Sequence, residues 1–311
     1  MSVAETAFGV ALGGAAALIG AGYGAEALRM PLTDADRAAA PGRIVDLPLG
    51  PVHVRDWGAA EARPVILVHG LSTPSDVWAP IATRLAGAGI RTLAPDLYGR
   101  GWSARPARVH DARLYRRQIR DLLDAEGIDR PRALVGYSMG GAVVADFADA
   151  LTDRAAPLAL LAPAGFIHAL AGQYAAMRVP LFGDAFWSLR AGAMLKAGAL
   201  AEGKDHDLPD LLQIISRETA RRGYLPAQLS ALRNLLAKPL TAAHTRLGAR
   251  GHDVLAVWGE DDDVIPISGM GKLTDANPNA RQEVVKMASH GLAYTHADEV
   301  AAILIDWMPP A

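Results

Sequence analysis

A serine, a histidine and a group of acids in this sequence have the residue types and spacing of a nucleophilic site. Ser138 is the middle residue of Gly136-Tyr-Ser-Met-Gly140, which follows an apolar run and precedes a run of small residues. A serine at a sharp turn from strand to helix keeps its hydroxyl exposed, and flanking glycines let the backbone pack closely around it. The pattern predicts an activated serine nucleophile.

A serine hydroxyl needs a base to remove its proton, and the base needs an acid to orient it. His290 lies in the short loop 288–291, between the last expected strand and the last expected helix. The acids form the run 260–263, directly after Gly259. Four adjacent carboxylates repel one another, so we expect at least one to have a specific partner. A divalent-cation site is the alternative interpretation of this run.

An oxyanion hole, a pair of backbone N–H groups facing the reacting oxygen, is the third requirement. The apolar run 65–69 ends at Gly70, which allows a tight bend, and the candidate donors are the N–H groups of Leu71 and Met139. We interpret the His69 imidazole as a turn-stabilising group without a chemical role.

A glycine-containing loop, 96–103, follows the next strand in the sequence. We interpret it as structural: its glycines indicate positive φ, and we expect the Asp96 carboxylate to hold it through hydrogen bonds.

These residues follow strand ends in an alternating pattern of apolar runs and amphipathic segments. Alternation of this kind predicts an α/β fold with a mainly parallel central sheet flanked by helices. The expected strands are 43–49, 52–57, 64–69, 91–94, 132–137, 158–162, 253–258 and 281–286, and the expected helices are 77–88, 112–126, 139–151, 268–276 and 297–307.

The alternation stops between 165 and 251, where we expect only helical segments rich in Met, Leu and aromatic residues. Parallel sheets bind ligands at the carboxyl ends of their strands, so an insertion leaving from there would cover the site. We therefore predict a core of residues 43–164 and 252–311 with a helical cap, or lid, of residues 165–251.

Residues 1–42 form an Ala- and Gly-rich leader that is uncharged between Glu5 and Glu26. This length fits a helix that spans a membrane, although the composition is weakly hydrophobic. The alternatives are a small-residue helix docked on the domain and a disordered leader. With an anchor, Arg29, Arg37 and Arg43 would keep the folded domain in the cytoplasm.

The overall composition excludes several classes of function. The chain has 311 residues, a formal net charge of -2 and no cysteine. The charge gives no case for a nucleic-acid partner, and the missing cysteines exclude disulfides and thiol catalysis. No phosphate-binding glycine motif follows a strand. We expect neither a metal nor an organic cofactor.

Along the sequence the candidate residues come in the order serine, acid, histidine, which is the order known for α/β-hydrolases. The chain resembles that superfamily from about Arg43 onward. In this family the acid stands three residues after the strand-end glycine, so the resemblance implies Asp262 as the third member of the triad. The chain departs from many relatives at 295–297, Thr-His-Ala, where they have Glu-x-Pro. The matching motifs are His69-Gly70, Asp96-x-x-Gly-x-Gly-x-Ser103, Gly136-Tyr-Ser-Met-Gly140, Gly259-x-x-Asp262-x-x-Ile265-Pro266 and Ser289-His290.

The resemblance implies a serine hydrolase of the capped esterase or lipase-like branch. We expect it to cleave carboxylic esters of apolar acyl groups through an acyl-enzyme. Two alternatives stay open: a carbon–carbon hydrolase of meta-cleavage products, which are vinylogous diketones, and a non-catalytic ligand-binding module on the same fold.

Overall fold

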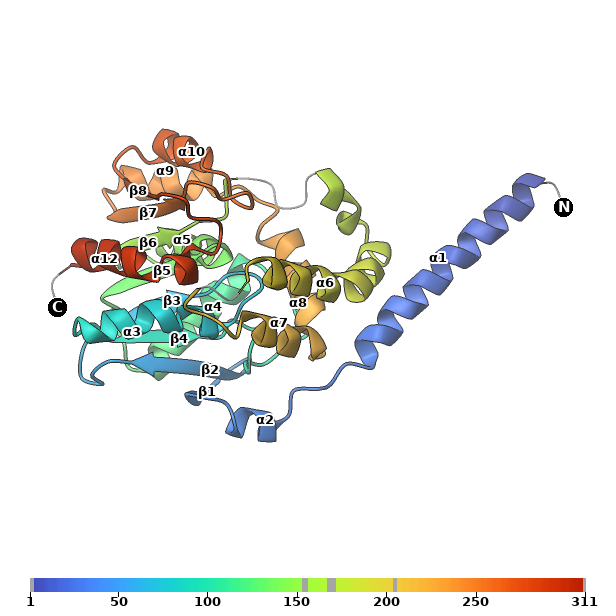
Figure 1. Cartoon of the computed structure of the whole chain (residues 1–311), viewed down its shortest axis with the longest axis horizontal. Helices are drawn as coiled ribbons and strands as arrows, with labels where there is room; N and C mark the ends of the chain where they lie inside the picture. Colours follow the sequence, from blue (N-terminus) through green and yellow to red (C-terminus); the bar gives the residue numbers. More distant parts are fainter. Residues whose placement is uncertain (1–2, 153–155, 167–171, 204–205, 310–311) are drawn as a thin grey trace.

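The computed structural model describes residues 3–152, 156–166, 172–203 and 206–309 (Figure 1). Its centre is an eight-stranded sheet in the order β1-β2-β4-β3-β5-β6-β7-β8. The first hairpin and the pairing of β2 with β4 are antiparallel, and the other pairings are parallel, so the predicted fold class is confirmed. The strands are β1 (Arg43–Leu47), β2 (Gly50–Trp57), β3 (Val65–Val68), β4 (Thr92–Pro95), β5 (Ala133–Tyr137), β6 (Leu158–Leu161), β7 (Val254–Gly259) and β8 (Arg281–Val285).

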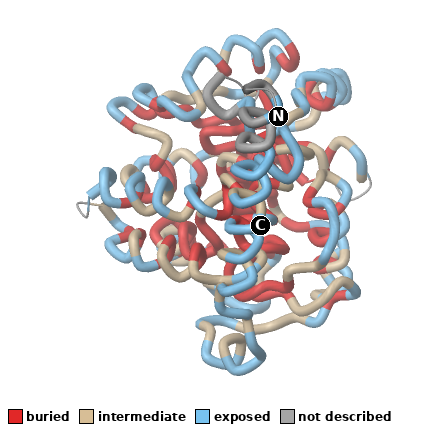
Figure 2. The backbone as a smooth tube through the Cα atoms, turned by 90° about the vertical axis from the view of Figure 1, so that its right-hand side faces the viewer, coloured by how far each residue is buried: buried red, intermediate tan, exposed pale blue. Residues whose placement is uncertain are grey.

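Helices cover both faces of the sheet, and the buried parts of the chain gather between these layers (Figures 1 and 2). One face carries α4 (Ala112–Ala125), α5 (Met139–Ala150), α9 (Thr241–Ala249) and α10 (Gly269–Ala276). The other carries the 3₁₀ turn η1 (Ser75–Trp78), α3 (Ala79–Gly87), α11 (Leu292–Thr295) and α12 (Ala297–Trp307).

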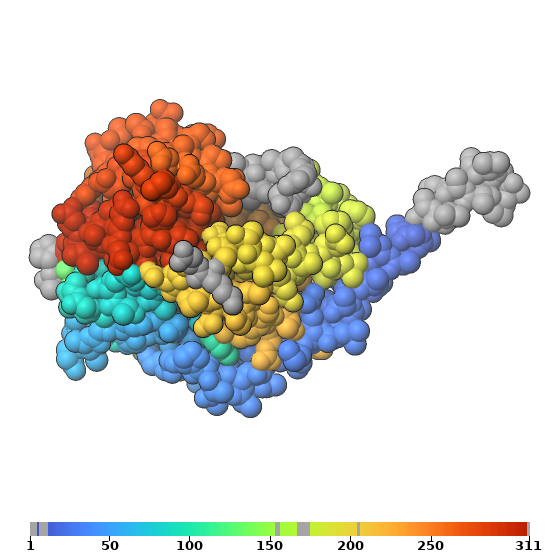
Figure 3. Space-filling model, viewed as in Figure 1, coloured from blue at the N-terminus to red at the C-terminus, as the bar shows by residue number. Residues whose placement is uncertain are grey.

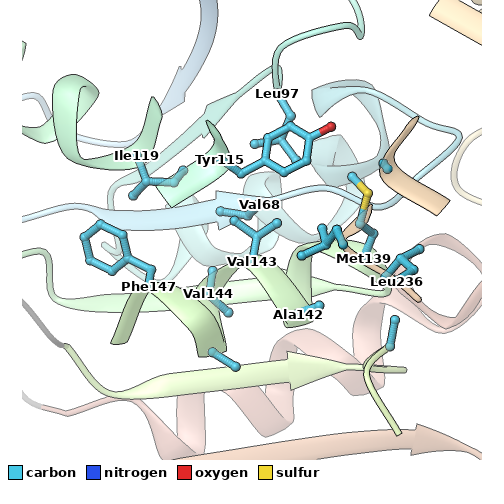
Figure 4. Close-up of a cluster of buried hydrophobic side chains, with 14 of the residues drawn as sticks. Val68, Leu97, Tyr115, Ile119, Met139, Ala142, Val143, Val144, Phe147 and Leu236 are labelled. Atoms are coloured by element: carbon cyan, nitrogen blue, oxygen red, sulfur yellow. The ribbon is translucent and has the colours of Figure 1, made fainter. Parts of the chain in front are cut away.

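The strand β5 illustrates why the central strands form. All five of its residues are buried, as expected for a continuous apolar run in a sheet covered on both sides. Because side chains alternate along a strand, Leu134 faces the α5 layer, whereas Val135 and Tyr137 face the α3 layer. Figure 4 shows Val143 and Phe147 of α5 packed within the first of these layers.

The described residues of the predicted cap form no strand but the helices η2 (Gly172–Arg178), α6 (Phe182–Ala201), α7 (Leu211–Ala220) and α8 (Tyr224–Asn234), which we call the cap helices. They lie together beside one end of the sheet (Figure 1). α9, near the end of the predicted cap range, packs against α5 and α10 of the core. Residues 167–171 and 204–205 of the predicted cap lie outside the described residues, and the domain boundaries stay predictions.

The leader forms one long helix, α1 (Val3–Ala27), followed by the short α2 (Asp34–Ala38). In Figure 1, α1 leads away from the body of the molecule, and its C-terminal part lies against α6. Figure 3 shows the same C-terminal part of α1 beside the cap. There Gly22 contacts α6 so closely that a Cβ atom would lie 2.3 Å from the Ala185 Cα. The Arg29 guanidinium, just beyond α1, donates to the carbonyl oxygens of Ser188, at 2.7 Å, and Thr219.

The membrane-spanning helix, one of the interpretations of the leader, is not supported. No helix in the described part of the chain has both the length and the apolar character that crossing a bilayer requires. Of the three interpretations of the leader, the C-terminal part of α1 agrees with a small-residue helix docked on the domain. Residues 1–2 lie outside the described residues.

Candidate active site

Ser138 stands between β5 and α5 in a strained turn. Its φ of 53° and ψ of -118° are unusual for a residue with a side chain. The turn is tight because Gly136 and Gly140 contact backbone directly. A Cβ on Gly136 would lie 2.4 Å from the Gly140 carbonyl oxygen, and a Cβ on Gly140 would lie 1.9 Å from that of Val68. Glycine is therefore required at both positions, because any side chain there would clash with the backbone.

The structure brings together the three side chains selected from the sequence. The His290 Nε2 lies 3.0 Å from the Ser138 Oγ, and the His290 Nδ1 lies 2.8 Å from the Asp262 Oδ2. The Asp262 carboxylate can only accept, so Nδ1 carries the proton and Nε2 turns its lone pair to the serine hydroxyl. In this state the imidazole is ready to take up the serine proton.

Backbone donors and an aromatic ring hold the acid and the base in place. The second oxygen of Asp262 accepts hydrogen bonds from the N–H groups of Val264, at 2.9 Å, and Ile265, at 2.7 Å. The Tyr137 ring lies 5.4 Å from the His290 ring, and its hydroxyl donates to the His290 carbonyl oxygen at 2.9 Å. Burial raises the pKa of Tyr137 well above its usual value, so the hydroxyl stays a donor.

The two predicted oxyanion donors lie beside the nucleophile. A Cβ on Gly70 would lie 3.3 Å from the Ser138 Cβ, so the loop after β3 passes directly over the serine. Met139 is the first residue of α5, where N–H groups have no partner within the helix. Within the described ranges, neither the Leu71 N–H nor the Met139 N–H donates a hydrogen bond, so both are free to bind an oxyanion.

His69 is buried behind this loop and holds it, as expected from the sequence. Its Nδ1 donates to the Gly70 carbonyl oxygen at 2.8 Å, and its Nε2 accepts from the Leu97 N–H at 2.8 Å. Burial lowers the pKa of His69 to about 4, so the ring is neutral near pH 7.

The loop after β4 is held by Asp96, also as predicted. Its carboxylate accepts hydrogen bonds from the N–H groups of Ser75, at 2.8 Å, and Trp102, at 3.0 Å. It also pairs with His53 Nδ1 at 2.7 Å, a contact that the sequence did not indicate. Burial is the largest single influence and opposes a charge on His53, but the hydrogen bond to Asp96, the negative charge of Asp96 and the hydrogen bond to the Pro41 carbonyl oxygen together raise the His53 pKa. The loop glycines Gly99 and Gly101 have positive φ.

A cavity of about 690 Å³ opens above Ser138 and His290. Its walls come from the loop 70–73 after β3, the helices α6, α7 and α8 of the predicted cap, and the loop after β7. Most of the lining is apolar, for example Leu195, Leu211 and Ile215. The charged residues among the described lining are both acids, Glu202 and Asp263, and no Arg or Lys is among them.

The alternative of a divalent-cation site at 260–263 finds no support. Among the residues that the structure describes, no group of three or more His, Cys, Asp or Glu side chains is arranged to hold a metal ion. Asp262 faces His290 instead, while Asp261 and Asp263 are exposed.

Sequence reasoning missed two residues of this site. Tyr137 is the residue directly before Ser138 in the serine motif, and its aromatic side chain at that position could have indicated a contact with the base. Glu202 lines the cavity from the end of α6, and nothing in the sequence pattern distinguishes it from other surface acids.

A family model described as the alpha/beta hydrolase family matches residues 65–303, which span both the serine turn and the histidine loop. The chain belongs to this family. The match confirms the resemblance inferred from the motifs and makes the protein a member of a hydrolase family.

Individual relatives of this hydrolase differ in the reactions that their names give. It is 27% identical over 278 residues to a 2-hydroxy-6-oxo-6-phenylhexa-2,4-dienoate hydrolase of Burkholderia cepacia, covering 83% of this chain and 91% of that protein. Among solved structures, an esterase from Exiguobacterium antarcticum has a TM-score of 0.72 at 19% identity, covering 86% of this chain and 99% of that chain. An enol-lactonase from Burkholderia xenovorans has a TM-score of 0.71 at 20% identity, and the match covers 85% of this chain and 98% of that chain. At these identities the two structures support the fold alone.

Proposed function

We propose that this hydrolase cleaves carboxylic esters of apolar acyl groups through an acyl-enzyme on Ser138. The proposal rests on two consecutive hydrogen bonds, between Asp262 and His290 and between His290 and Ser138. Ser138 and His290 line a mainly apolar cavity that can hold the substrate. A serine hydroxyl is a weak nucleophile until an adjacent base removes its proton.

In the first half of the reaction, His290 Nε2 takes the serine proton as Ser138 Oγ attacks the ester carbonyl carbon. The N–H groups of Leu71 and Met139 stabilise the oxyanion, a contribution of about 3 kcal/mol per donor. Asp262 stabilises the imidazolium without taking its proton. The intermediate then expels the alcohol, which receives the proton from His290.

In the second half, His290 removes a proton from water, and the hydroxide attacks the acyl carbon. The Ser138–acyl bond breaks, and the proton on His290 returns to the serine oxygen. The products are one carboxylic acid and one alcohol from one ester and one water. The reaction draws on no redox partner.

The charge of the cavity favours esters over the carbon–carbon alternative. The Burkholderia cepacia relative acts, by its name, on a dienoate, which carries a carboxylate. In this chain the charged residues among the described lining are Glu202 and Asp263, which repel an anion in a partly apolar site. We therefore propose an uncharged ester as substrate and keep the dienoate reaction as the second candidate, because the sequence similarity favours it.

A substrate panel separates the two reactions. We expect p-nitrophenyl butyrate to be turned over with a kcat/KM at least about 100-fold above that for 2-hydroxy-6-oxo-6-phenylhexa-2,4-dienoate, a difference of about 3 kcal/mol. Glu202→Gln should raise kcat/KM for an ester with a free carboxylate on its acyl chain more than for the butyrate, with Glu61→Gln as an exposed control. A dienoate preference would overturn the ester assignment.

Variants of the nucleophile and base test the mechanism. Ser138→Ala and His290→Ala should each lower kcat at least about 1000-fold, and the double variant should be little worse than either, because the residues act as one unit. Labelling by a fluorophosphonate should disappear in Ser138→Ala. A wild-type chain that resists labelling, and that turns over no ester, would instead support the non-catalytic binding module.

A further inference from the structure

The oxyanion loop, residues 70–73, is held from two sides by side chains that are distant in sequence. The Leu71 carbonyl oxygen accepts a hydrogen bond from Arg100 Nε at 3.3 Å. The Ser72 carbonyl oxygen accepts one from the Tyr224 hydroxyl at 2.7 Å. Arg100 belongs to the core loop after β4, whereas Tyr224 is the first residue of the cap helix α8.

This loop needs such support because the Leu71 N–H belongs to neither a helix nor a strand. An oxyanion donor is effective only when it is oriented before the charge develops. Hydrogen bonds to two successive carbonyl groups restrict the backbone dihedrals of Leu71 and Ser72. The peptide that carries the Leu71 N–H is itself held by His69, whose Nδ1 donates to the Gly70 carbonyl oxygen, and the two further hydrogen bonds hold the backbone that follows it. Together they restrict the direction of the Leu71 N–H, whereas the Met139 N–H is already fixed by its place at the start of α5.

Arg100 is unusual because its guanidinium is completely buried and, within the described chain, pairs with no carboxylate. Its Nη1 donates to the Tyr98 carbonyl oxygen, at 3.2 Å, and to the Tyr115 hydroxyl, and its Nη2 lies 3.9 Å from the Met139 sulfur. Burial of a cation without an opposite charge beside it is unfavourable. Here the cation touches both residues that carry the proposed donors, close to where negative charge develops during the reaction.

Tyr224 brings the cap into the same arrangement. Its side chain is fully buried, and burial raises its pKa, so the hydroxyl remains a donor. Gln228, one turn later in α8, donates from its amide to the Ser72 Oγ at 3.2 Å. The start of α8 is held in turn by α1, because the Gly223 N–H donates to the Glu26 carboxylate at 2.6 Å.

We propose that Arg100 and Tyr224 are positioning residues that hold the Leu71 N–H in the oxyanion hole, so that the cap takes part in catalysis and not only in covering the substrate. This inference rests on the serine-hydrolase mechanism proposed above. It assigns to α8 a role in transition-state stabilisation, which differs from a role in substrate binding.

The variant that tests this is Tyr224→Phe, which removes one hydroxyl and keeps the buried ring. Tyr98→Phe is the matched control, because Tyr98 is also almost completely buried and its hydroxyl donates to the carbonyl oxygen of Gly50, the first residue of β2, at 3.3 Å. We expect Tyr224→Phe to lower kcat about tenfold with KM within about twofold, and Tyr98→Phe to change neither by more than about twofold.

A second readout separates positioning from a general loss of stability. An alkyl boronic acid, which forms a tetrahedral adduct with the serine, should bind Tyr224→Phe about tenfold more weakly, in parallel with kcat. The melting temperatures of the two Phe variants should fall by similar amounts. Arg100→Lys, which keeps the charge but moves the donors, should lower kcat in the same way.

The outcomes distinguish this inference from the proposed function. If Ser138→Ala abolishes ester turnover while Tyr224→Phe matches Tyr98→Phe in kcat and in boronic acid affinity, the positioning role is wrong and the mechanism stands. A Tyr224→Phe variant with a raised KM and unchanged kcat would also contradict it. If Ser138→Ala retains turnover, the proposed function itself fails.

Discussion

At the scale of single residues, Asp262 differs from its neighbours in burial and not in chemistry. It is 5% exposed and accepts three hydrogen bonds, whereas Asp261 and Asp263 are exposed. Residue type alone could not choose among the acids of the run 260–263. The resemblance selected Asp262, and the geometry agrees with that choice, because only the fold determines which carboxylate meets His290.

This arrangement predicts unequal effects of two similar substitutions. Asp262→Asn should lower kcat for an activated ester on the order of 10⁴-fold, because the imidazole then loses its correct tautomer and its charge stabilisation. Asp261→Asn should leave kcat within about threefold. Initial rates with p-nitrophenyl butyrate measure both effects, and a larger loss in Asp261→Asn would show that the acid is misassigned.

At the scale of elements, the leader shows where sequence reasoning reached its limit. Its low-hydrophobicity, small-residue composition was compatible with a membrane helix, a docked helix and a disordered segment. What separates them is the contact of Gly22 with Ala185 of α6, which lies far away in the sequence. The central strands were predictable, because a short apolar run bounded by turn residues is a local signal. The packing of the cap helices was not, because it depends on contacts such as Tyr224 with Ser72.

Two glycines of α1 allow the docking to be tested. Gly22→Leu should separate α1 from α6, because a Cβ there would lie 2.3 Å from the Ala185 Cα, and should lower the melting temperature by several degrees. Gly20→Leu is the control, since a Cβ on Gly20 meets nothing within 4 Å. Limited proteolysis should cut α1 faster in Gly22→Leu than in Gly20→Leu. Equal rates would contradict the docking.

At the scale of the whole molecule, three buried histidines make stability depend on pH. Burial lowers the pKa of His69 and His244 to about 4 and that of His110 to about 3. Their folded forms are neutral, whereas the unfolded chain takes up protons below its histidine pKa of about 6.5. The stability that depends on these groups is therefore complete above about pH 6.5 and decreases as the pH falls toward 4.

His244 is the simplest of the three to remove, because its buried Nδ1 has no hydrogen-bond partner in the described structure. Between pH 7 and pH 5 the free energy of unfolding of His244→Leu should fall by about 2 kcal/mol less than that of the wild type. Urea unfolding at the two pH values measures this difference. Equal losses in the two proteins would mean that His244 does not contribute to acid sensitivity.

The docking of α1 on the cap also sets an order of events during synthesis. α1 is synthesised before the cap helices, and its contact at Ala185 appears about 160 residues later, which at typical rates of translation takes about ten to thirty seconds. During that time the surface of α1 around Gly22 lacks its native partner Ala185. A nascent chain of this protein therefore exposes α1 until α6 has been made, and chaperone dependence should map to the leader and not to the α/β core.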